Sequence, residues 1–289
     1  MRVLVICDRM AGLSPRGASE VVGRAFADEG AQVAVIPVGA SGPELADSVA
    51  TMKSEMQLVV PTNLPELLEL LQPGPGALVV DASNVSPPPL AELVGACTPE
   101  KLSEVRERLD GRKVVLVVPT GDAGHSLTGL DGRIAELGRE RGADLRETID
   151  QDNQAEAWAA AIEVDPTFAG AGALGGVGSV VLGLGGRIAS GLEFCLEEYE
   201  ATRVASRADV IVTGAALLDF HDLGGPLVKM LAQVSADCQR PLVAVAGRTY
   251  VSARELRNAG IEAAYSVLPG AGGEEPDSEQ LLEASRKVA

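Results

Sequence analysis

The chain has two histidines, and each stands beside acidic residues in a polar stretch. His125 follows Asp122 in the sequence GDAGHS, and His221 lies between Asp219 and Asp222. A carboxylate that hydrogen-bonds to an imidazole can orient it as a general base. Because neither stretch offers a partner nucleophile, the plainer interpretation of a solvated loop histidine is favoured at both positions. His221 with its two aspartates supplies only two or three of the ligands that a metal ion needs, so no metal site is predicted.

A second set of candidates follows the expected strands. Asp8, Asp81, Gly214, and the pair Gly247 and Arg248 each come after a run of apolar, mostly β-branched residues. In a parallel sheet the ligand contacts gather at the carboxyl ends of the strands. Each position alone is more typical of a turn or a helix cap. Together they predict a crevice.

The glycine-rich stretch from Gly170 to Gly175 satisfies the pattern GxGxxG, with Glu193 near the spacing at which an acid would hold a ribose. A dinucleotide fingerprint needs a strand directly before it, whereas Asp165–Thr167 is predicted to form a turn. A nicotinamide-dependent oxidoreductase is therefore ranked last, and NAD is not expected. None of the five lysines follows a glycine, which excludes a P-loop.

Alternating apolar runs and helical patterns predict an α/β fold with parallel sheets. Strands are expected at Val3–Cys7, Gln32–Val38, Leu58–Val60, Ala77–Asp81, Val114–Val118, Asp209–Val212, Leu242–Ala246 and Ala263–Val267. Helices are expected from Pro15 to Gly30, at Pro99–Leu109, from Ile134 to Arg141, and at Gly176–Leu184, Leu192–Glu200, Pro226–Val234 and Ser252–Ala259. The acidic stretch Glu147–Glu156 is interpreted as a connection between subdomains.

Composition excludes several classes of function. The 24 basic and 41 acidic residues give a net charge of −17, which repels nucleic acids and anionic membrane surfaces. The longest apolar stretch, near Gly175–Gly186, is too short to span a bilayer. The four cysteines are widely scattered, which favours reduced, buried thiols and a cytoplasmic location. Neither haem nor a structural metal is expected.

The order of motifs from about Ala171 to Gly270 resembles the type 1 glycerate kinase family. GAGALGGVGSVVLGLGGRIASGLE is similar to the glycine-rich helix of that family, ADVIVTGAALLD to its strand ending in ITGEGRLD, and RPLVAVAGRTY with AGIEAAYSVLPG to its last two strands. The start, MRVLVICDRMAGLS, resembles the family's opening strand and DSFKGSLS turn. The chain is shorter than is usual in the family.

The resemblance implies a flavodoxin-like parallel-sheet domain built from both chain ends, residues 1–56 and 190–289. A second α/β domain, residues 57–189, would be inserted between them. It also implies phosphorylation of glycerate, with ATP and Mg²⁺ as cofactors, in the cleft between the two domains.

Several charged residues of the family motifs are replaced. Where the family has GEGRLDGQSLRGKAP, the chain keeps Gly214, Leu218, Asp219, Leu223 and Gly225 and loses the Glu, Arg, Gln, Ser and Lys positions. At the first turn Asp8 and Gly12 match, but Ala11 stands where the family has lysine. Ala40 likewise replaces an aspartate.

Loss of several preorganised charges removes most of the stabilisation of a phosphoryl-transfer transition state. We therefore expect a degenerate homologue with weak or no kinase activity. Asp8, Gly12, Gly214, Gly247 and Arg248 would line the remaining pocket. Two alternatives stay open. In one, an active kinase uses Asp219, His221 and Asp222 as substituted catalytic groups. In the other, a binding or scaffold protein uses the former cleft for a small anionic metabolite or a protein partner, with a homodimer left open.

Overall fold

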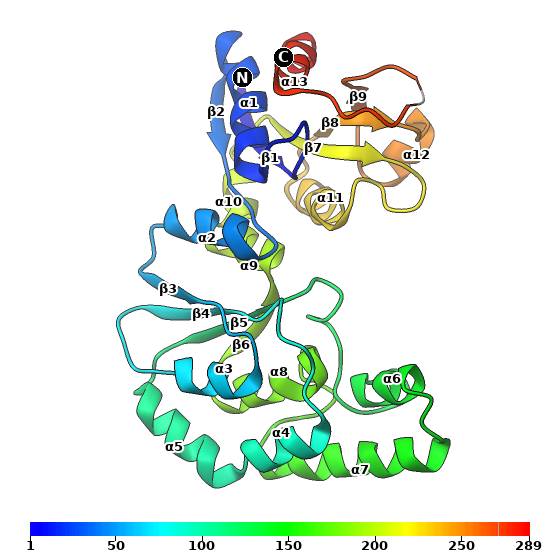
Figure 1. The fold of residues 1–289 in the computed structure, drawn as a ribbon. Helices are drawn as coiled ribbons and strands as arrows, with labels where there is room; N and C mark the ends of the chain where they lie inside the picture. The colour runs from blue at the N-terminus through cyan, green and yellow to red at the C-terminus, as the bar shows by residue number, and fades with distance from the viewer. Residues whose placement is uncertain (271) are drawn as a thin grey trace. The chain divides into compact units, whose positions relative to one another are not determined.

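The computed structural model describes residues 1–270 and 272–289. The chain divides into two compact units, and each contains one parallel sheet. The first unit comprises Met1–Gly39 and Cys195–Ala289, and the second comprises Ala40–Phe194. Helix α9 (Gly191–Glu198) crosses the second boundary. Both chain ends therefore belong to the same unit (Figure 1).

The sheet of the first unit has five strands in the order β2-β1-β7-β8-β9, all parallel. Counted within the unit, this order is 2-1-3-4-5, which is the flavodoxin-like order, and it confirms the predicted fold class. The elements of this unit are β1 (Arg2–Cys7), α1 (Pro15–Asp28), β2 (Gln32–Val35), α10 (Ala201–Ala205), β7 (Val210–Leu218), α11 (Pro226–Cys238), β8 (Leu242–Thr249), α12 (Ala253–Asn258), β9 (Ala263–Ser266) and α13 (Ser278–Val288).

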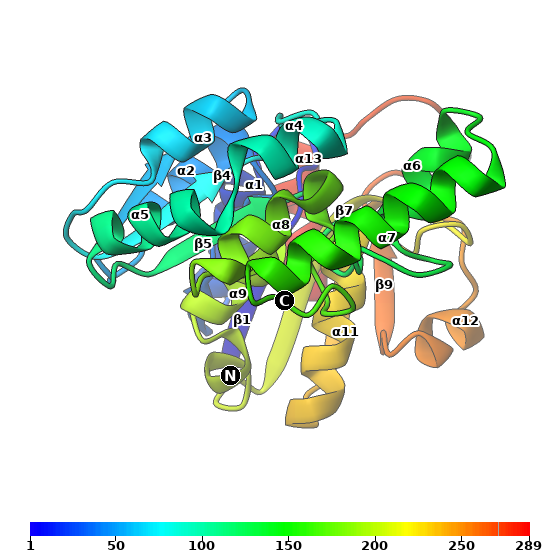
Figure 2. The same ribbon diagram turned by 90° about the horizontal axis from the view of Figure 1, so that it is seen from below.

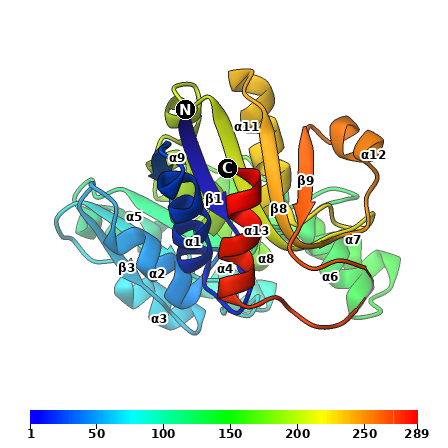
Figure 3. The same ribbon diagram turned by 90° about the horizontal axis from the view of Figure 1, so that it is seen from above.

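Helices cover both faces of this sheet. Helices α1 and α13 lie side by side on one face, where Val5, Phe26 and Leu281 are buried in one cluster (Figure 3). Helix α11 lies on the opposite face and contacts β7 and β8 (Figure 1). Because the strands are covered on both faces, their sequences are continuous apolar runs and not alternating ones.

The sheet of the second unit has four parallel strands in the order β3-β4-β5-β6. Leu78, Leu116 and Trp158 belong to the large apolar cluster on its helix-covered side. The elements of this unit are α2 (Gly42–Ala50), β3 (Met56–Val59), α3 (Leu64–Leu70), β4 (Ala77–Asp81), α4 (Leu90–Ala96), α5 (Pro99–Leu109), β5 (Val114–Val118), α6 (Arg133–Glu140), α7 (Leu145–Ala161), α8 (Ala173–Gly183) and β6 (Arg187–Ser190).

The interpretation of Glu147–Glu156 as a connection was wrong, because this stretch lies inside helix α7. The Asp144 carboxylate caps the helix by accepting a hydrogen bond from the Glu147 amide at 2.7 Å. Ala155, Trp158 and Ala159 are buried at helical spacing, and the stretch from Glu147 to Glu156 is otherwise mostly polar. A polar helix face was mistaken for a loop.

The expected domain boundaries can be placed on these elements. The expected first boundary, after residue 56, falls inside β3, which pairs with β4. The second unit begins at residue 40 and includes helix α2. Residue 190 ends β6, which pairs with β5 in the same unit. Across the described residues, no helix combines the length and the apolar character needed to cross a membrane.

Candidate functional site

The strand order of the first unit reverses between β1 and β7, and ligands of doubly wound sheets bind outside such a point. Asp8 and Gly214 meet there, because Cys7 is in register with Gly214 and the Asp8 amide donates to the Gly214 carbonyl at 2.9 Å. The Asp8 carboxylate accepts a hydrogen bond from the Arg9 amide at 2.7 Å. Two of the predicted residues are thus brought together at one end of the sheet.

Two candidate glycines lie within strands and not after them. Strand β7 continues to Leu218 and β8 to Thr249, so Gly214 and Gly247 are interior positions. A Cβ on Gly214 would lie 2.6 Å from Met10 Sδ, and one on Gly247 would lie 2.4 Å from the Ala216 carbonyl oxygen. Packing therefore accounts for both glycines.

Gly12 lies in the tight turn between β1 and α1. The Leu13 amide donates to the Met10 carbonyl at 2.9 Å, and both central residues, Ala11 and Gly12, have positive φ values of 55° and 68°. Glycine adopts this conformation at no steric cost, whereas Ala11 is strained. Ala11, which stands where the resembled family motif has lysine, gives this turn a small side chain.

The loop between β7 and α11 carries the other candidates. Asp219 Oδ1 accepts hydrogen bonds from the amides of His221 and Asp222, each at 3.0 Å. Asp222 Oδ1 pairs with Lys229 Nζ at 2.9 Å. The His221 side chain is exposed, and so is Phe220 at 63%. Two of the three acid/base candidates therefore bind other groups of the same loop and helix.

Two carboxylates approach Gly225, the residue before α11. A Cβ on Gly225 would lie 3.7 Å from Asp222 Oδ2 and 4.0 Å from Asp8 Oδ2. The first turn and the β7–α11 loop thus bring their acids to the same place, although these residues are far apart in the sequence. Within the described ranges, no group of three or more histidine, cysteine or acidic side chains is placed to hold a metal ion.

Arg248 is held by the main chain. Its Nη1 donates to the carbonyls of Pro269 and Gly270, both at 2.9 Å, and its Nη2 donates to that of Glu274 at 3.3 Å. The guanidinium therefore fixes the segment after β9 to the end of β8. These contacts occupy both Nη atoms, whereas the buried Nε has no hydrogen-bond partner among the described residues.

The second unit contains a more enclosed cluster, in the loop after β5. Asp122 Oδ1 lies 3.1 Å from His125 Nδ1 and 3.8 Å from Arg133 Nε, and Asp122 Oδ2 accepts a hydrogen bond from the Leu174 amide at 2.9 Å. The side chains of Asp122 and Arg133 are only 12% and 15% exposed, and that of His125 is 33% exposed. The predicted pairing of His125 with a neighbouring acid is present in the structure.

The glycine-rich segment closes over this cluster. The amides of Gly170 and Gly172 both donate to the His125 carbonyl, at 3.0 and 2.9 Å. Leu174 has φ 51°, and Gly175 and Gly176 are also left-handed, which turns the Leu174 amide toward Asp122. The element before this segment is helix α7, followed by a turn. It therefore differs from the strand–loop–helix arrangement of a dinucleotide fingerprint.

Charges around Arg133 are coupled. Its Nη1 contacts Glu136 Oε2 at 2.5 Å and Glu140 Oε1 at 3.7 Å. The hydrogen bond from Arg133 lowers the pKa of the Glu136 carboxyl below its usual range. The cluster therefore joins Asp122, His125 and Arg133 to Glu136 and Glu140 of helix α6.

Buried carboxylate Asp81 has a structural partner. Its Oδ2 accepts a hydrogen bond from the Gly42 amide at 2.6 Å, and its Oδ1 accepts one from the Ser83 amide at 3.1 Å. Gly42 has φ 58° and begins α2. Asp81 therefore anchors the start of that helix.

The cysteines offer no nucleophile at either site. Burial raises the pKa of the Cys7 thiol to about 12 and that of Cys97 to about 11, so both are protonated at neutral pH. No disulfide joins cysteines in the part of the chain that the structure describes.

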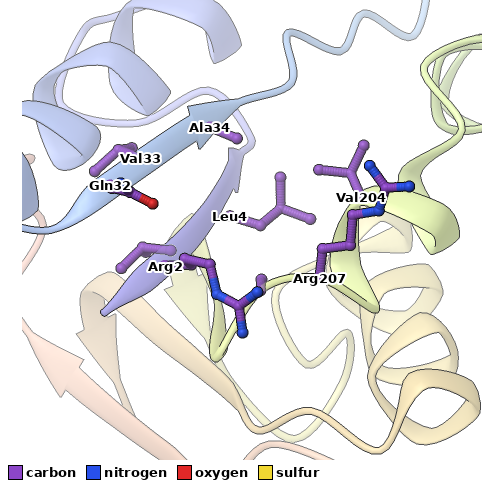
Figure 4. Close-up of a pocket in the computed structure, with 9 residues that line it drawn as sticks. Arg2, Leu4, Gln32, Val33, Ala34, Val204 and Arg207 are labelled. Atoms are coloured by element: carbon purple, nitrogen blue, oxygen red, sulfur yellow. The ribbon is translucent and has the colours of Figure 1, made fainter.

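A small pocket of about 210 Å³ lies at the other end of β1 and β2, away from the predicted residues of this unit (Figure 4). Leu4 forms part of its apolar lining, with Val204 of α10, and Arg2 and Arg207 also line it. Arg2 is paired with Asp209 at 2.7 Å. None of the sequence candidates lines this pocket.

The chain therefore belongs to the class of two-unit α/β proteins. One unit is flavodoxin-like with acidic loops after its strands, and the other contains a second parallel sheet. A family model described as "Glycerate kinase family" matches residues 74–287. The chain belongs to the glycerate kinase family.

Individual relatives agree with this assignment. The chain is 28% identical over 280 residues to a glycerate kinase of Bacillus subtilis (strain 168), which covers 95% of this chain and 67% of that protein. It is 32% identical over 165 residues to the uncharacterized protein Mb2228c of Mycobacterium bovis, covering 55% of this chain. The match spans 43% of the mycobacterial protein, which is less than half of its length.

A solved structure assigned as glycerate kinase 2 of Salmonella typhimurium LT2 has the same fold. It superimposes with a TM-score of 0.65 at 16% identity and covers all of this chain and 96% of its own. At this identity the match supports the fold alone.

Proposed function

We propose that this family member binds a small anionic metabolite, of the hydroxy-acid class that the family name indicates, with weak or no phosphoryl transfer. The ligand class follows the name of the family, and one observation carries the weak or absent phosphoryl transfer. The charged side chains Asp219, Asp222 and Arg248 of the first unit bind groups of the same unit, at the β7–α11 loop and at the end of β8. These side chains serve the scaffold, and the Glu, Arg and Lys positions of the family motif are not kept in this loop.

Phosphoryl transfer requires cations that neutralise the negative charge spread over the transferred group. The Lys229 ammonium is neutralised by Asp222, and the Nη1 of Arg248 binds two carbonyls. Ala11 stands at the family's lysine position. At the mouth of the same loop Leu217 is 41% exposed and Phe220 is 63% exposed. Such a surface suits an apolar contact better than a triphosphate.

The residues of this unit do not fit a bound Mg²⁺ and nucleotide. Mg²⁺ takes one or two carboxylates when phosphate oxygens complete its coordination. The carboxylates of Asp8 and Asp222 both lie near Gly225, but that of Asp222 is already paired with Lys229.

The convergence of Asp8 and Asp222 is also the observation that favours the second candidate, an active kinase with substituted groups. In that case Lys229 would exchange its carboxylate for phosphate, and Asp219 and His221 would act on the substrate. The two candidates differ in one measurable property, which is turnover.

The test measures ADP formation from Mg-ATP and D-glycerate, together with the heat of D-glycerate binding. We expect D-glycerate to bind and ADP formation to stay at background in the wild type and in Asp219→Ala and Asp222→Ala. Asp237→Ala, which removes an exposed acid in α11, is the matched control. An active kinase would be established if the wild type and Asp237→Ala formed ADP and if Asp219→Ala and Asp222→Ala did not. Absence of both binding and turnover would contradict the proposed ligand.

A cytoplasmic location is part of the same proposal. It is supported by the four cysteines, which are free thiols in the part of the chain that the structure describes. Reducing compartments keep thiols in this state.

A further inference from the structure

The second unit carries an apolar groove between α6 and α7, which lie side by side at one edge of the unit (Figure 2). The groove has a volume of about 480 Å³. Three large apolar side chains around it are exposed: Leu130 at 90%, Leu145 at 76% and Ile149 at 49%. Its lining residues are Gly129, Leu130, Ala135, Arg139, Ala143, Leu145, Thr148, Ile149 and Asp152.

Exposure of Leu130 is fixed by the fold. Arg139 Nη1 donates a hydrogen bond to the Leu130 carbonyl at 3.0 Å. The Gly129 amide donates to both carboxylate oxygens of Asp152, each at 3.2 Å. Side chains from α6 and α7 thus hold the loop from both sides. A large apolar side chain that is held in solvent in this way is typical of an interaction site.

We propose that this groove binds the same groove of a second copy of the chain, in a two-fold symmetric dimer. A two-fold interface must be complementary to itself. The groove meets this condition, because small residues such as Ala135 and Ala143 form the hollow and Leu130 and Leu145 form projections that a copy of the hollow can receive.

Charge at the groove points to the same partner. The lining contains one arginine and one aspartate and is neutral, whereas the whole chain carries −17. Two copies would repel each other over most of their surfaces and least at a neutral apolar patch. Arg139 uses one of its five N–H donors on Leu130, so others can reach the partner's Asp152.

The test is sedimentation velocity of the full chain over a range of micromolar concentrations, at low and high salt. We expect a concentration-dependent dimer that strengthens as salt screens the repulsion between the acidic chains. Leu145→Glu and Ile149→Glu should each weaken dimerisation on the order of 100-fold. The matched control is Phe168→Glu, which adds the same charge at a side chain that is 59% exposed and does not line the groove.

Circular dichroism checks that the variants fold, and Leu145→Ala, expected to weaken the dimer about tenfold, provides a second test without added charge. A wild type that stays monomeric throughout would overturn the proposal. So would a dimer that Leu145→Glu and Ile149→Glu weaken no more than Phe168→Glu does. The result does not depend on the proposed function, because neither turnover nor ligand binding is measured.

Discussion

The loop after β5 in the second unit and the loop after β7 in the first carry the same kinds of residue, an aspartate with a histidine two or three positions later. In the second unit Asp122 is enclosed and binds His125 together with the Leu174 amide. In the first unit Asp219 binds only amides of its own loop, and the His221 side chain is exposed. The same local signal thus gives a preorganised cluster in one unit and a self-contained turn in the other.

The difference comes from a distant segment. The glycine-rich stretch around Leu174 packs onto the β5 loop and donates a hydrogen bond to Asp122, whose side chain is only 12% exposed. In the β7 loop, Asp219 binds amides of the loop itself and Asp222 pairs with the exposed Lys229. Enclosure strengthens electrostatic interactions, since water no longer screens them. The comparison predicts that substitutions in the two units will differ in effect.

The largest expected effect comes from the close approach within the glycine-rich segment. A Cβ on Gly178 would lie 1.9 Å from the Gly170 carbonyl oxygen, so Gly178→Ala must displace the segment that holds Asp122. We expect Gly178→Ala to lower the free energy of unfolding by about 3 kcal/mol or more in urea denaturation. Gly121→Ala, where no atom lies within 4 Å of the new Cβ, is the control. Equal stability of the two variants would contradict the close packing.

Removal of the enclosed carboxylate should have the next largest effect. Asp122→Ala leaves the Leu174 amide without its acceptor and removes the carboxylate that lies 3.8 Å from Arg133 Nε, and we expect the free energy of unfolding to fall by about 2–3 kcal/mol. Asp222→Ala removes an exposed pair with Lys229 and should cost less than about 1 kcal/mol. Thermal unfolding of both variants measures these two losses of stability. If Asp222→Ala were the more damaging change, the contrast between the units would be lost.

Arg248 tests whether charge in the first unit serves the scaffold. Arg248→Met removes the donors to the carbonyls of Pro269 and Gly270, which should cost about 1–2 kcal/mol and speed proteolysis of the segment that carries them. Arg254→Met, at an exposed position of α12, should change neither property. If Arg248→Met were cleaved at the same rate as the wild type, a scaffold role would be contradicted and Arg248 would again be a candidate for ligand binding.

The smallest effect concerns pH. Hydrogen bonds from Arg2 lower the pKa of the exposed Asp209 carboxyl to about 2. Because the folded value is the lower one, the pair stabilises the fold above the unfolded pKa of about 3.9, and this contribution is lost as pH falls toward 2. Urea unfolding of Asp209→Asn should therefore show a shallower loss of stability between these values than the wild type. Parallel curves would mean that the pair contributes nothing.

Much of the fold could be predicted because short stretches of sequence indicate its strands and helices. Strand β4, strand β5 and helix α5 match their predicted bounds, since β-branched runs and the Thr98–Pro99 cap are signals within a few residues. Only the end of helix α7, around Trp158–Ile162, was predicted as a helix, because the polar residues from Glu147 to Glu156 hide the helical spacing of Ala155 and Trp158. Short helices such as α2 offer too few residues for a period to show.

The site was harder to predict, since its contacts join distant segments. The pairing of Asp122 with the Leu174 amide spans 52 residues, and that of Arg248 with Pro269 spans 21. Its position after an expected strand marked Arg248 as a candidate, and the family motif and the neighbouring His221 marked Asp219. Only the structure shows that carbonyls and amides of the same unit already bind them.

The most direct test of the central claim is a phosphorus NMR spectrum of the purified protein with Mg-ATP and D-glycerate. If the charges of the first unit serve the scaffold, no phosphoglycerate resonance should appear and the ATP signals should persist. A new phosphoglycerate resonance that disappears in Asp219→Ala and Asp222→Ala would show that the altered loop still transfers phosphate, and it would contradict the account.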